Sequence, residues 1–223
     1  MPPIQPTYHS RIFRDFKEIE ESNHRRIIHF YEGQEGQIRG LDFEEYFELL
    51  MAYVNGLFEV GYHQKHLLMV EVAIGEVIAQ NVRLYKGEDV LERLLFRKAA
   101  SHYRCLQYDA CDHTLKELVR INPFHTDAAA FLKKCLRRKE PRFVQHAKAL
   151  SIAAFLVAAL VIAFEVLLVR PFYEVYAKDV ELSRNGVFAL GCLSLIGGLL
   201  IHRWRVSQKV EAFVRRARAA KGA

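Results

Sequence analysis

The sequence predicts an all-α protein in which a helical domain is followed by a two-helix transmembrane hairpin and a basic amphipathic C-terminal helix. Three observations lead to this prediction. Apolar residues recur at helical spacing through residues 1–140, two long apolar runs follow, and Lys and Arg gather on both outer flanks of those runs. With 51% hydrophobic and 26% charged residues, the composition also excludes a disordered chain.

The first part of the chain is predicted to be helical throughout. Apolar spacing and polar breaks give five helices, at about Phe43–Phe58, His63–Asn81, Asp89–Leu106, Asp109–Ile121 and Asp127–Arg138. At least one more is expected in residues 10–32. Asp42, followed by Glu45, is a capping-box-like start for the first of the five. No stretch has the alternation and turn residues of strands, and the short breaks predict antiparallel helical hairpins.

Two apolar runs follow. Ala149–Val169 has 21 residues with Glu165 as its only ionisable group, and a helix of this length spans about 31 Å, the thickness of a bilayer's hydrocarbon core. The first apolar run and the basic flank that precedes it are together assigned to residues 141–169. Gly186–Ile201 has 16 residues and spans about 24 Å, with Trp204 expected at the headgroups. We interpret both as transmembrane helices; a buried or re-entrant helix is the alternative for the second.

The net charge of +6 is unevenly distributed, and its distribution predicts a topology. Residues 133–148 hold seven Lys or Arg and one Glu, residues 202–223 hold the same numbers, and the connecting loop, residues 170–185, holds three of each sign. Because Lys and Arg near membrane segments stay in the cytoplasm, both termini are expected there and the loop on the other side. An aromatic anchor is expected in the loop, formed by Phe172, Tyr173 and Tyr176.

The rest of the composition points to a cytoplasmic domain. Residues 1–132 carry 15 Lys or Arg against 20 Asp or Glu, so this domain would repel phosphate and no nucleic-acid partner is expected. The N-terminus lacks the apolar core of a signal peptide. The cysteines are too few and scattered for a secreted disulfide scaffold: Cys105, Cys111, Cys135 and Cys192. A two-pass protein of the bacterial inner membrane is expected.

The stretch Lys98–Pro123, KAASHYRCLQYDACDHTLKELVRINP, resembles a tetratricopeptide repeat. The resemblance is carried by small and aromatic residues on two helices and by a closing proline: Ala99, Tyr103, Tyr108, Ala110 and Pro123. A weaker copy lies at about Phe43–Asn81, with Tyr53, Phe58 and Gly61 in comparable places. The Trp of the family signature is missing, as is the Gly after the small residue. The last helix of the domain would then be the solvating cap of the array.

The resemblance implies protein binding, because tetratricopeptide-like stacks present a concave groove to peptides or partner domains. A cytoplasmic protein or peptide partner is therefore expected. The polar residues expected to line the groove are Asn55, Glu59, Arg97, His102 and Arg104. The alternative is that these side chains form an ordinary solvated face.

Each apolar run carries a stripe of mostly small residues at i, i+4, i+7 and i+11. The stripes are Ala154, Ala158, Val161 and Glu165 on the first run and Val187, Gly191, Ser194 and Gly198 on the second. Small residues let helices approach closely, so the stripes are expected to meet within one chain or between chains as a homo-oligomer. Glu165 is either a functional intramembrane carboxylate or a group that reaches the interface or pairs with Arg170.

The basic tail, residues 202–223, has an apolar stripe with cations elsewhere on the helix. Such a helix either lies on the anionic lipid of the cytoplasmic leaflet or docks on the acidic helical domain. The sequence leaves both alternatives open.

No catalytic or cofactor-binding motif is present, so neither an enzyme activity nor a cofactor is expected. The nearest approach to a metal site is His102, Cys105, Cys111 and His113, but Cys-x5-Cys is not a usual zinc spacing and no metal is expected. An exposed acidic helix face is expected at Glu44, Glu45 and Glu48. The leading hypothesis is a membrane-anchored adaptor that holds a cytoplasmic partner. The alternative is a small oligomeric channel or membrane-perturbing effector regulated by the helical domain.

Overall fold

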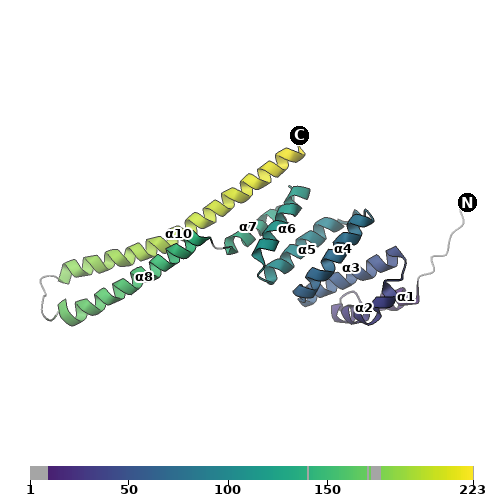
Figure 1. The fold of residues 1–223 in the computed structure, drawn as a ribbon, viewed down its shortest axis with the longest axis horizontal. Coiled ribbons are helices and arrows are strands. Elements are labelled where there is room, and N and C mark those ends of the chain that lie inside the picture. Colours follow the sequence, from purple (N-terminus) through teal and green to yellow (C-terminus); the bar gives the residue numbers. More distant parts are fainter. Residues whose placement is uncertain (1–9, 140, 170, 172–176, 223) are drawn as a thin grey trace, which may run out of the picture. The chain divides into compact units, whose positions relative to one another are not determined.

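The computed structural model describes residues 10–139, 141–169, 171 and 177–222. The chain divides into two compact units, Met1–Leu132 and Lys133–Ala223, and the boundary falls inside α7 (Thr126–Arg138). Apart from one short β-hairpin, every regular element in the described residues is helical (Figure 1). The predicted all-α class is therefore confirmed.

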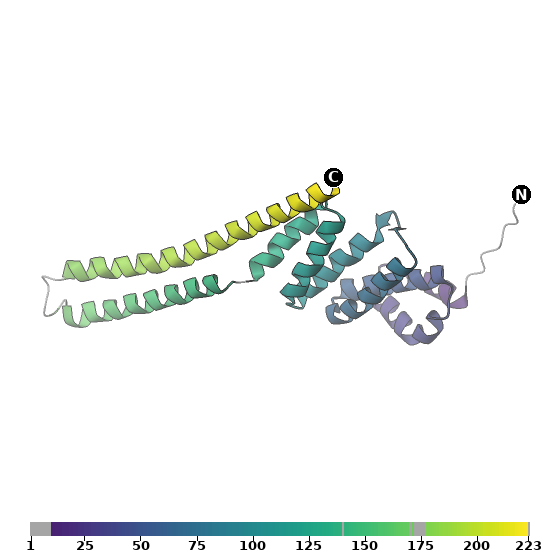
Figure 2. The ribbon, with the colours of Figure 1, turned by 45° about the horizontal axis from the view of Figure 1, so that its top comes forward.

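The first unit is a succession of helices in which each packs on the next. In order they are α1 (Arg11–Lys17), α2 (His24–Ile38), α3 (Phe43–Val60), α4 (His63–Ala79), α5 (Val90–Arg104) and α6 (Tyr108–Ile121). α2 packs on α3, α3 on α4, α4 on α5 and α5 on α6 (Figures 1 and 2). Short connections favour such pairing of neighbours, and fully buried side chains such as Leu50, Leu94 and Leu118 fill the core between the helices.

Several helices of this unit begin where a polar side chain caps the backbone. Such a side chain accepts a hydrogen bond from the backbone N–H three residues on at Ser10, Asn23 and Asp89. The cap at Asn23 starts a second helix inside residues 10–32, where at least one was expected. Asp42 stands at the start of α3 as predicted, but its side chain makes no capping hydrogen bond. Glu45 instead accepts a hydrogen bond from the Ser10 backbone N–H at 2.9 Å.

The expectation that no strand would form is wrong at one place. β1 (Leu84–Tyr85) and β2 (Glu88–Asp89) pair antiparallel between α4 and α5. The two residues between them, Lys86 and Gly87, both have positive φ, 51° and 84°, as a type I′ turn requires. Strands of two residues have no alternation to detect, so only the Lys-Gly pair could have indicated the hairpin.

The second unit contains two helices long and apolar enough to cross a membrane. α8 (Arg142–Phe164) continues into a π-helical turn, η1 (Glu165–Val169), and α10 (Ala177–Lys221) follows. The apolar windows of the two helices have mean hydropathies of 2.9 and 1.7, yet only 22% and 17% of their residues are buried. A core helix of a water-soluble protein would be mostly buried, whereas the described residues leave most of this apolar surface uncovered.

Small residues allow α8 and α10 to lie closely side by side (Figures 1 and 2). Ala154 and Ala158 are buried on α8, and Gly191 is buried on α10, where an added Cβ would lie 3.2 Å from the Ala154 Cβ. The Ser194 hydroxyl donates a hydrogen bond to the Ala147 carbonyl at 3.2 Å. The two helices therefore meet within one chain, one of the two arrangements left open by the sequence.

The connecting loop is shorter than predicted, and the tail is not a separate helix. α10 begins at Ala177, inside the expected loop 170–185, and continues without a break to Lys221. No proline follows Pro171, so nothing in the sequence removes a backbone donor from the helix after that point. The expected aromatic anchor and the expected cation partner of Glu165 lie outside the described residues: Phe172, Tyr173, Tyr176 and Arg170.

Replacing Gly198 by Ala should destabilise the α8–α10 pair. A Cβ at Gly198 would lie 2.8 Å from the Ala147 Cβ, which cannot turn away, and such overpacking costs about 1–3 kcal/mol. The matched control is Gly197→Ala, because a Cβ there would meet nothing within 4 Å. Separation of α8 from α10 in SDS, followed by energy transfer between labels on the two helices, measures both variants. Equal effects of the two substitutions would contradict the close contact.

Candidate functional site

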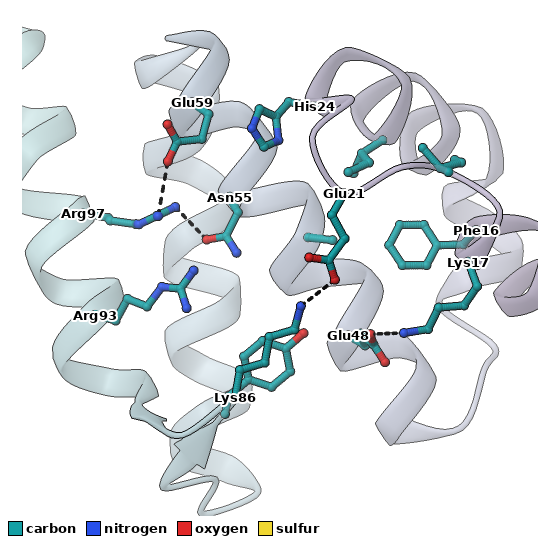
Figure 3. Close-up of a pocket in the computed structure, with 14 residues that line it drawn as sticks. Phe16, Lys17, Glu21, His24, Glu48, Asn55, Glu59, Lys86, Arg93 and Arg97 are labelled. Carbon is teal, nitrogen blue, oxygen red and sulfur yellow. Dashed lines mark hydrogen bonds and ion pairs between the residues drawn. The ribbon is translucent and has the colours of Figure 1, made fainter.

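A cavity of about 440 Å³ opens in the first unit where α1, α2, α3, α5 and the β-hairpin meet (Figure 3). We call it the α3–α5 groove. Its apolar lining residues are Phe16, Ile19, Ile27, Ala52 and Tyr85. Its polar lining residues are Lys17, Glu21, His24, Glu48, Asn55, Glu59, Lys86, Arg93 and Arg97. Apolar surface and charges of both signs therefore meet in one concave site.

Three of the five polar residues selected from the sequence line this groove. They are Asn55 and Glu59, one turn apart on α3, and Arg97 on α5. His102 and Arg104 do not line it. They lie in the last turn of α5, where the His102 Nδ1 is 2.8 Å from the Gln107 Oε1. The structure thus brings part of the selected set together and leaves two members outside.

Arg97 is the most constrained charge in the groove. Its Nη1 donates to the Asn55 Oδ1 at 2.7 Å, and its Nη2 lies 3.3 Å from the Glu59 Oε1 (Figure 3). Its guanidinium carbon lies 5.0 Å from the centre of the Phe58 ring, within cation–π range. Burial lowers the pKa of Arg97, although it stays charged at any physiological pH.

Sequence reasoning missed the other charges of the groove. Lys17 on α1 pairs with Glu48 on α3, and Lys86 in the hairpin turn donates to the Glu21 Oε1 at 2.8 Å (Figure 3). That bond holds the pKa of Glu21 below its ordinary value. Glu48 was expected on an exposed acidic face. Lys17, Glu21 and Lys86 belong to a short helix, a connection and a hairpin turn, so only the tertiary fold brings them to Glu48 and the other groove residues on α3.

Two histidines and a serine form a buried polar cluster between α4 and α5. The Ser101 Oγ lies 2.8 Å from the His66 Nδ1 and 3.3 Å from the His63 Nδ1. His66 and Ser101 have no exposed surface, and the His66 Nε2 has no hydrogen-bond partner among the described residues. Burial, aided by the charge of Arg97, lowers the pKa of His66 to about 4. The cluster adjoins the groove through Phe58, whose ring centre is 5.3 Å from that of His66.

The described residues contain no group of three or more His, Cys, Asp or Glu side chains that could hold a metal ion. Of the four considered from the sequence, Cys111 is buried in α6, and His113 is an exposed residue one turn from Glu117. His102 contacts Gln107, as described above. The four therefore do not converge.

The residues selected on the apolar runs all lie at the contact between α8 and α10. Glu165 has 1% of its surface exposed, and the Arg184 Nη1 donates to its Oε2 at 2.8 Å. An added Cβ at Gly191 or Gly198 would lie 2.8 Å from a side-chain atom of α8, and Ser194 bonds across the contact. The sequence did not indicate Arg184 as a partner, because the expected loop included it.

Acid should destabilise the first unit through His66. Its pKa is lowered from 6.5 to about 4, so between these values the unfolded chain binds a proton that the folded chain does not. The free energy of unfolding should therefore fall as the pH falls through this window, by up to about 1.4 kcal/mol per pH unit. Urea unfolding of the full chain in detergent, followed by circular dichroism, measures the slope.

The variant His66→Gln should flatten that slope, because an amide does not titrate. His113→Gln is the control, since His113 is exposed on α6. A wild-type slope in the His66 variant would show that another group takes up the proton.

Removing the Glu165 carboxylate should loosen the α8–α10 pair. Glu165→Ala leaves Arg184 without its buried partner, at a cost of about 1–3 kcal/mol, less than for a fully buried pair because Arg184 is partly exposed. Exchanging the charges, with Glu165→Arg and Arg184→Glu together, should recover much of the loss. The same helix-separation measurement applies. A double variant as weak as Glu165→Ala would mean that the attraction of the two charges is not what holds this contact.

Comparisons with known proteins assign the chain to no family. No protein-family model matches it, and no match is found with a curated protein or a solved structure. The function of the groove must be inferred from its own contacts, charges and burial.

Proposed function

We propose that this chain is a membrane-anchored adaptor. Its tetratricopeptide-like helical domain binds a peptide segment of a cytoplasmic protein in the α3–α5 groove, while α8 and α10 hold the domain at the membrane. The single observation that carries the binding proposal is the convergence of Asn55, Glu59 and Arg97 on one cavity. The sequence predicts all three as groove residues.

The outward faces of α8 and α10 support the membrane anchor. Leu160 and Leu193 are 70% and 72% exposed, and many other large apolar side chains of the two helices are exposed with them. Water penalises such a surface by about 25 cal/mol per Å², whereas lipid does not. Exposed apolar faces on two adjacent helices of sufficient length are what a bilayer would cover.

The packing of α5 on α6 supports the tetratricopeptide-like interpretation. Ala99 is fully buried, as a small residue of a repeat hairpin should be, and Pro123 is buried after α6. The rings of Tyr103 and Tyr108 meet edge to face across the turn, with centres 5.5 Å apart. The burial of Ala99 and Pro123 and the contact between Tyr103 and Tyr108 therefore support the resemblance.

The chemistry of the groove favours binding over catalysis. Its three carboxylates each pair with a cation: Glu21 with Lys86, Glu48 with Lys17 and Glu59 with Arg97. A general acid near neutral pH needs a raised pKa, whereas the hydrogen bond from Lys86 lowers the pKa of Glu21. The exposed Lys86–Glu21 pair contributes only about 0–1 kcal/mol, so an incoming peptide can exchange partners with it at little cost.

The basic flanks support a topology with both termini in the cytoplasm of a bacterial cell. The channel hypothesis has less support. It requires Glu165 and the small residues to face a pore or a second chain, whereas both are engaged in the contact between α8 and α10.

The adaptor proposal is tested by photo-crosslinking in cells. A benzophenone amino acid at Ala52, which lines the groove, should capture a discrete partner with the full-length protein. Arg97→Gln in the same chain should reduce that capture about tenfold or more, because it removes a charge bound to two groove residues.

The matched control is Arg104→Gln, which removes the same charge from α5 outside the groove. Thermal unfolding must show that both variants are folded. Capture that survives Arg97→Gln, or that is lost equally in the Arg104 variant, would count against the α3–α5 groove as the binding site.

A further inference from the structure

Four arginines gather where α7 ends, α8 begins and α10 leaves its apolar stretch. They are Arg137, Arg142, Arg203 and Arg205, and all four are exposed. None of their side chains makes a hydrogen bond or an ion pair within the part of the chain that the structure describes. The cations of the α3–α5 groove, in contrast, are each paired with a carboxylate. These arginines are therefore available to a ligand.

The three helix segments at this junction are held together by aromatic and histidine contacts. His202 on α10 is buried, and its Nε2 lies 3.4 Å from the carbonyl oxygen of Arg137 on α7. Its ring packs against Phe143 of α8, with centres 6.1 Å apart. Phe143 in turn lies beneath the Arg205 guanidinium, whose carbon is 5.2 Å from the ring centre. The junction is thus a built structure and not only a run of basic sequence.

The contact with Phe143 prepares Arg205 to bind an oxyanion. A guanidinium above an aromatic ring is held by its face, which leaves the N–H groups at its edge free to donate. Paired N–H donors match phosphate geometry. Arg142 precedes Phe143 in the chain and adds a second exposed cation to the same end of α8. The carboxylate of Glu211, farther along α10, is taken by Lys133 at 2.9 Å.

The junction lies at the edge of the apolar surface. The exposed apolar residues of α10 end at Ile201 and Trp204, and those of α8 begin at Leu150. Trp204 is 65% exposed, as expected of an aromatic side chain at a lipid headgroup. Arg215 and Arg216 lie about 16 Å farther along the same helix, beyond the screening length of about 8 Å at physiological salt.

We propose that this junction binds the phosphate of an anionic phospholipid, with Arg142 and Arg205 as the contacting residues and Phe143 as the residue that positions Arg205. The proposal rests on the membrane anchoring proposed above. It requires a local site at the headgroups, in contrast to a diffuse attraction that all cations of the tail would share. The acyl chains would then run along the exposed face of α10 beside Trp204.

Trp204 is the only tryptophan of the sequence and therefore reports on this site alone. The full chain is reconstituted in phosphatidylcholine vesicles with a minor fraction of phosphatidylglycerol, and one lipid or the other carries brominated acyl chains that quench tryptophan. Brominated phosphatidylglycerol should quench Trp204 more than its mole fraction predicts. The junction should bind phosphatidylglycerol about fivefold or more strongly than it binds phosphatidylcholine, which is the factor expected from one cation at the surface.

The double variant Arg142→Gln, Arg205→Gln should bring this ratio close to one, and Phe143→Leu should lower it while both charges remain. The matched control is Arg215→Gln, Arg216→Gln, which removes the same charge and should leave the ratio unchanged. Because each ratio compares two lipids within one variant, a general change in fluorescence cancels.

Three results would overturn the proposal. Equal quenching by both lipids in the wild type would show that the junction has no preference for anionic lipid and therefore no such site. If the Arg215, Arg216 variant lost as much of the preference for phosphatidylglycerol as the Arg142, Arg205 variant, the attraction would be diffuse. Inorganic phosphate that abolishes the preference, at an ionic strength matched with chloride, would assign the arginines to free phosphate. Absence of quenching by either lipid is distinguishable from these, because it would refute the membrane anchor itself.

Discussion

When two helices pack together, each covers only one face of the other. In the second unit that shared face is made of small residues, whereas leucine, isoleucine, valine and phenylalanine cover the outward faces. Nothing in the described part of the unit covers those outward faces, and the proposed membrane anchor would meet the constraint that apolar surface avoids water. The basic residues beyond the apolar stretch and the buried Glu165–Arg184 pair are consistent with the same constraint, because each keeps a charge either outside the apolar zone or paired within it.

The charges of the two units are arranged in different ways. In the first unit, cations and carboxylates from distant segments meet as pairs around a cavity with an apolar lining. Such a site suits a ligand that brings its own mixture of apolar and charged groups, as a peptide does. At the junction of α7, α8 and α10, Arg137, Arg142, Arg203 and Arg205 have no acidic partners among the described residues, and an aromatic ring orients Arg205. Such a site suits a simple anion.

Helical periodicity accounts for the part of the candidate site that could be predicted. Asn55 and Glu59 lie one turn apart on a strongly periodic helix, and Arg97 is on a similar helix, so their faces followed from spacing. Lys17, Glu21 and Lys86 could not be found in this way. They belong to a short helix, a connection and a hairpin turn, where the direction of a side chain depends on contacts with α3 and not on a repeat. His102 and Arg104 do not line this cavity, because spacing describes a face but not the position along α5 at which the cavity ends.

The sequence by itself determined the helical class, the approximate extent of the helices in the first unit, and the two apolar stretches. These properties depend on the order of apolar and polar residues along the chain, which is local information. The tertiary structure alone decided that α10 is one continuous helix, that the small residues of α8 and α10 meet within one chain, and that Arg184 pairs with Glu165. Those outcomes depend on which surfaces meet in space, and the residues of one helix face do not by themselves specify which other helix it will contact.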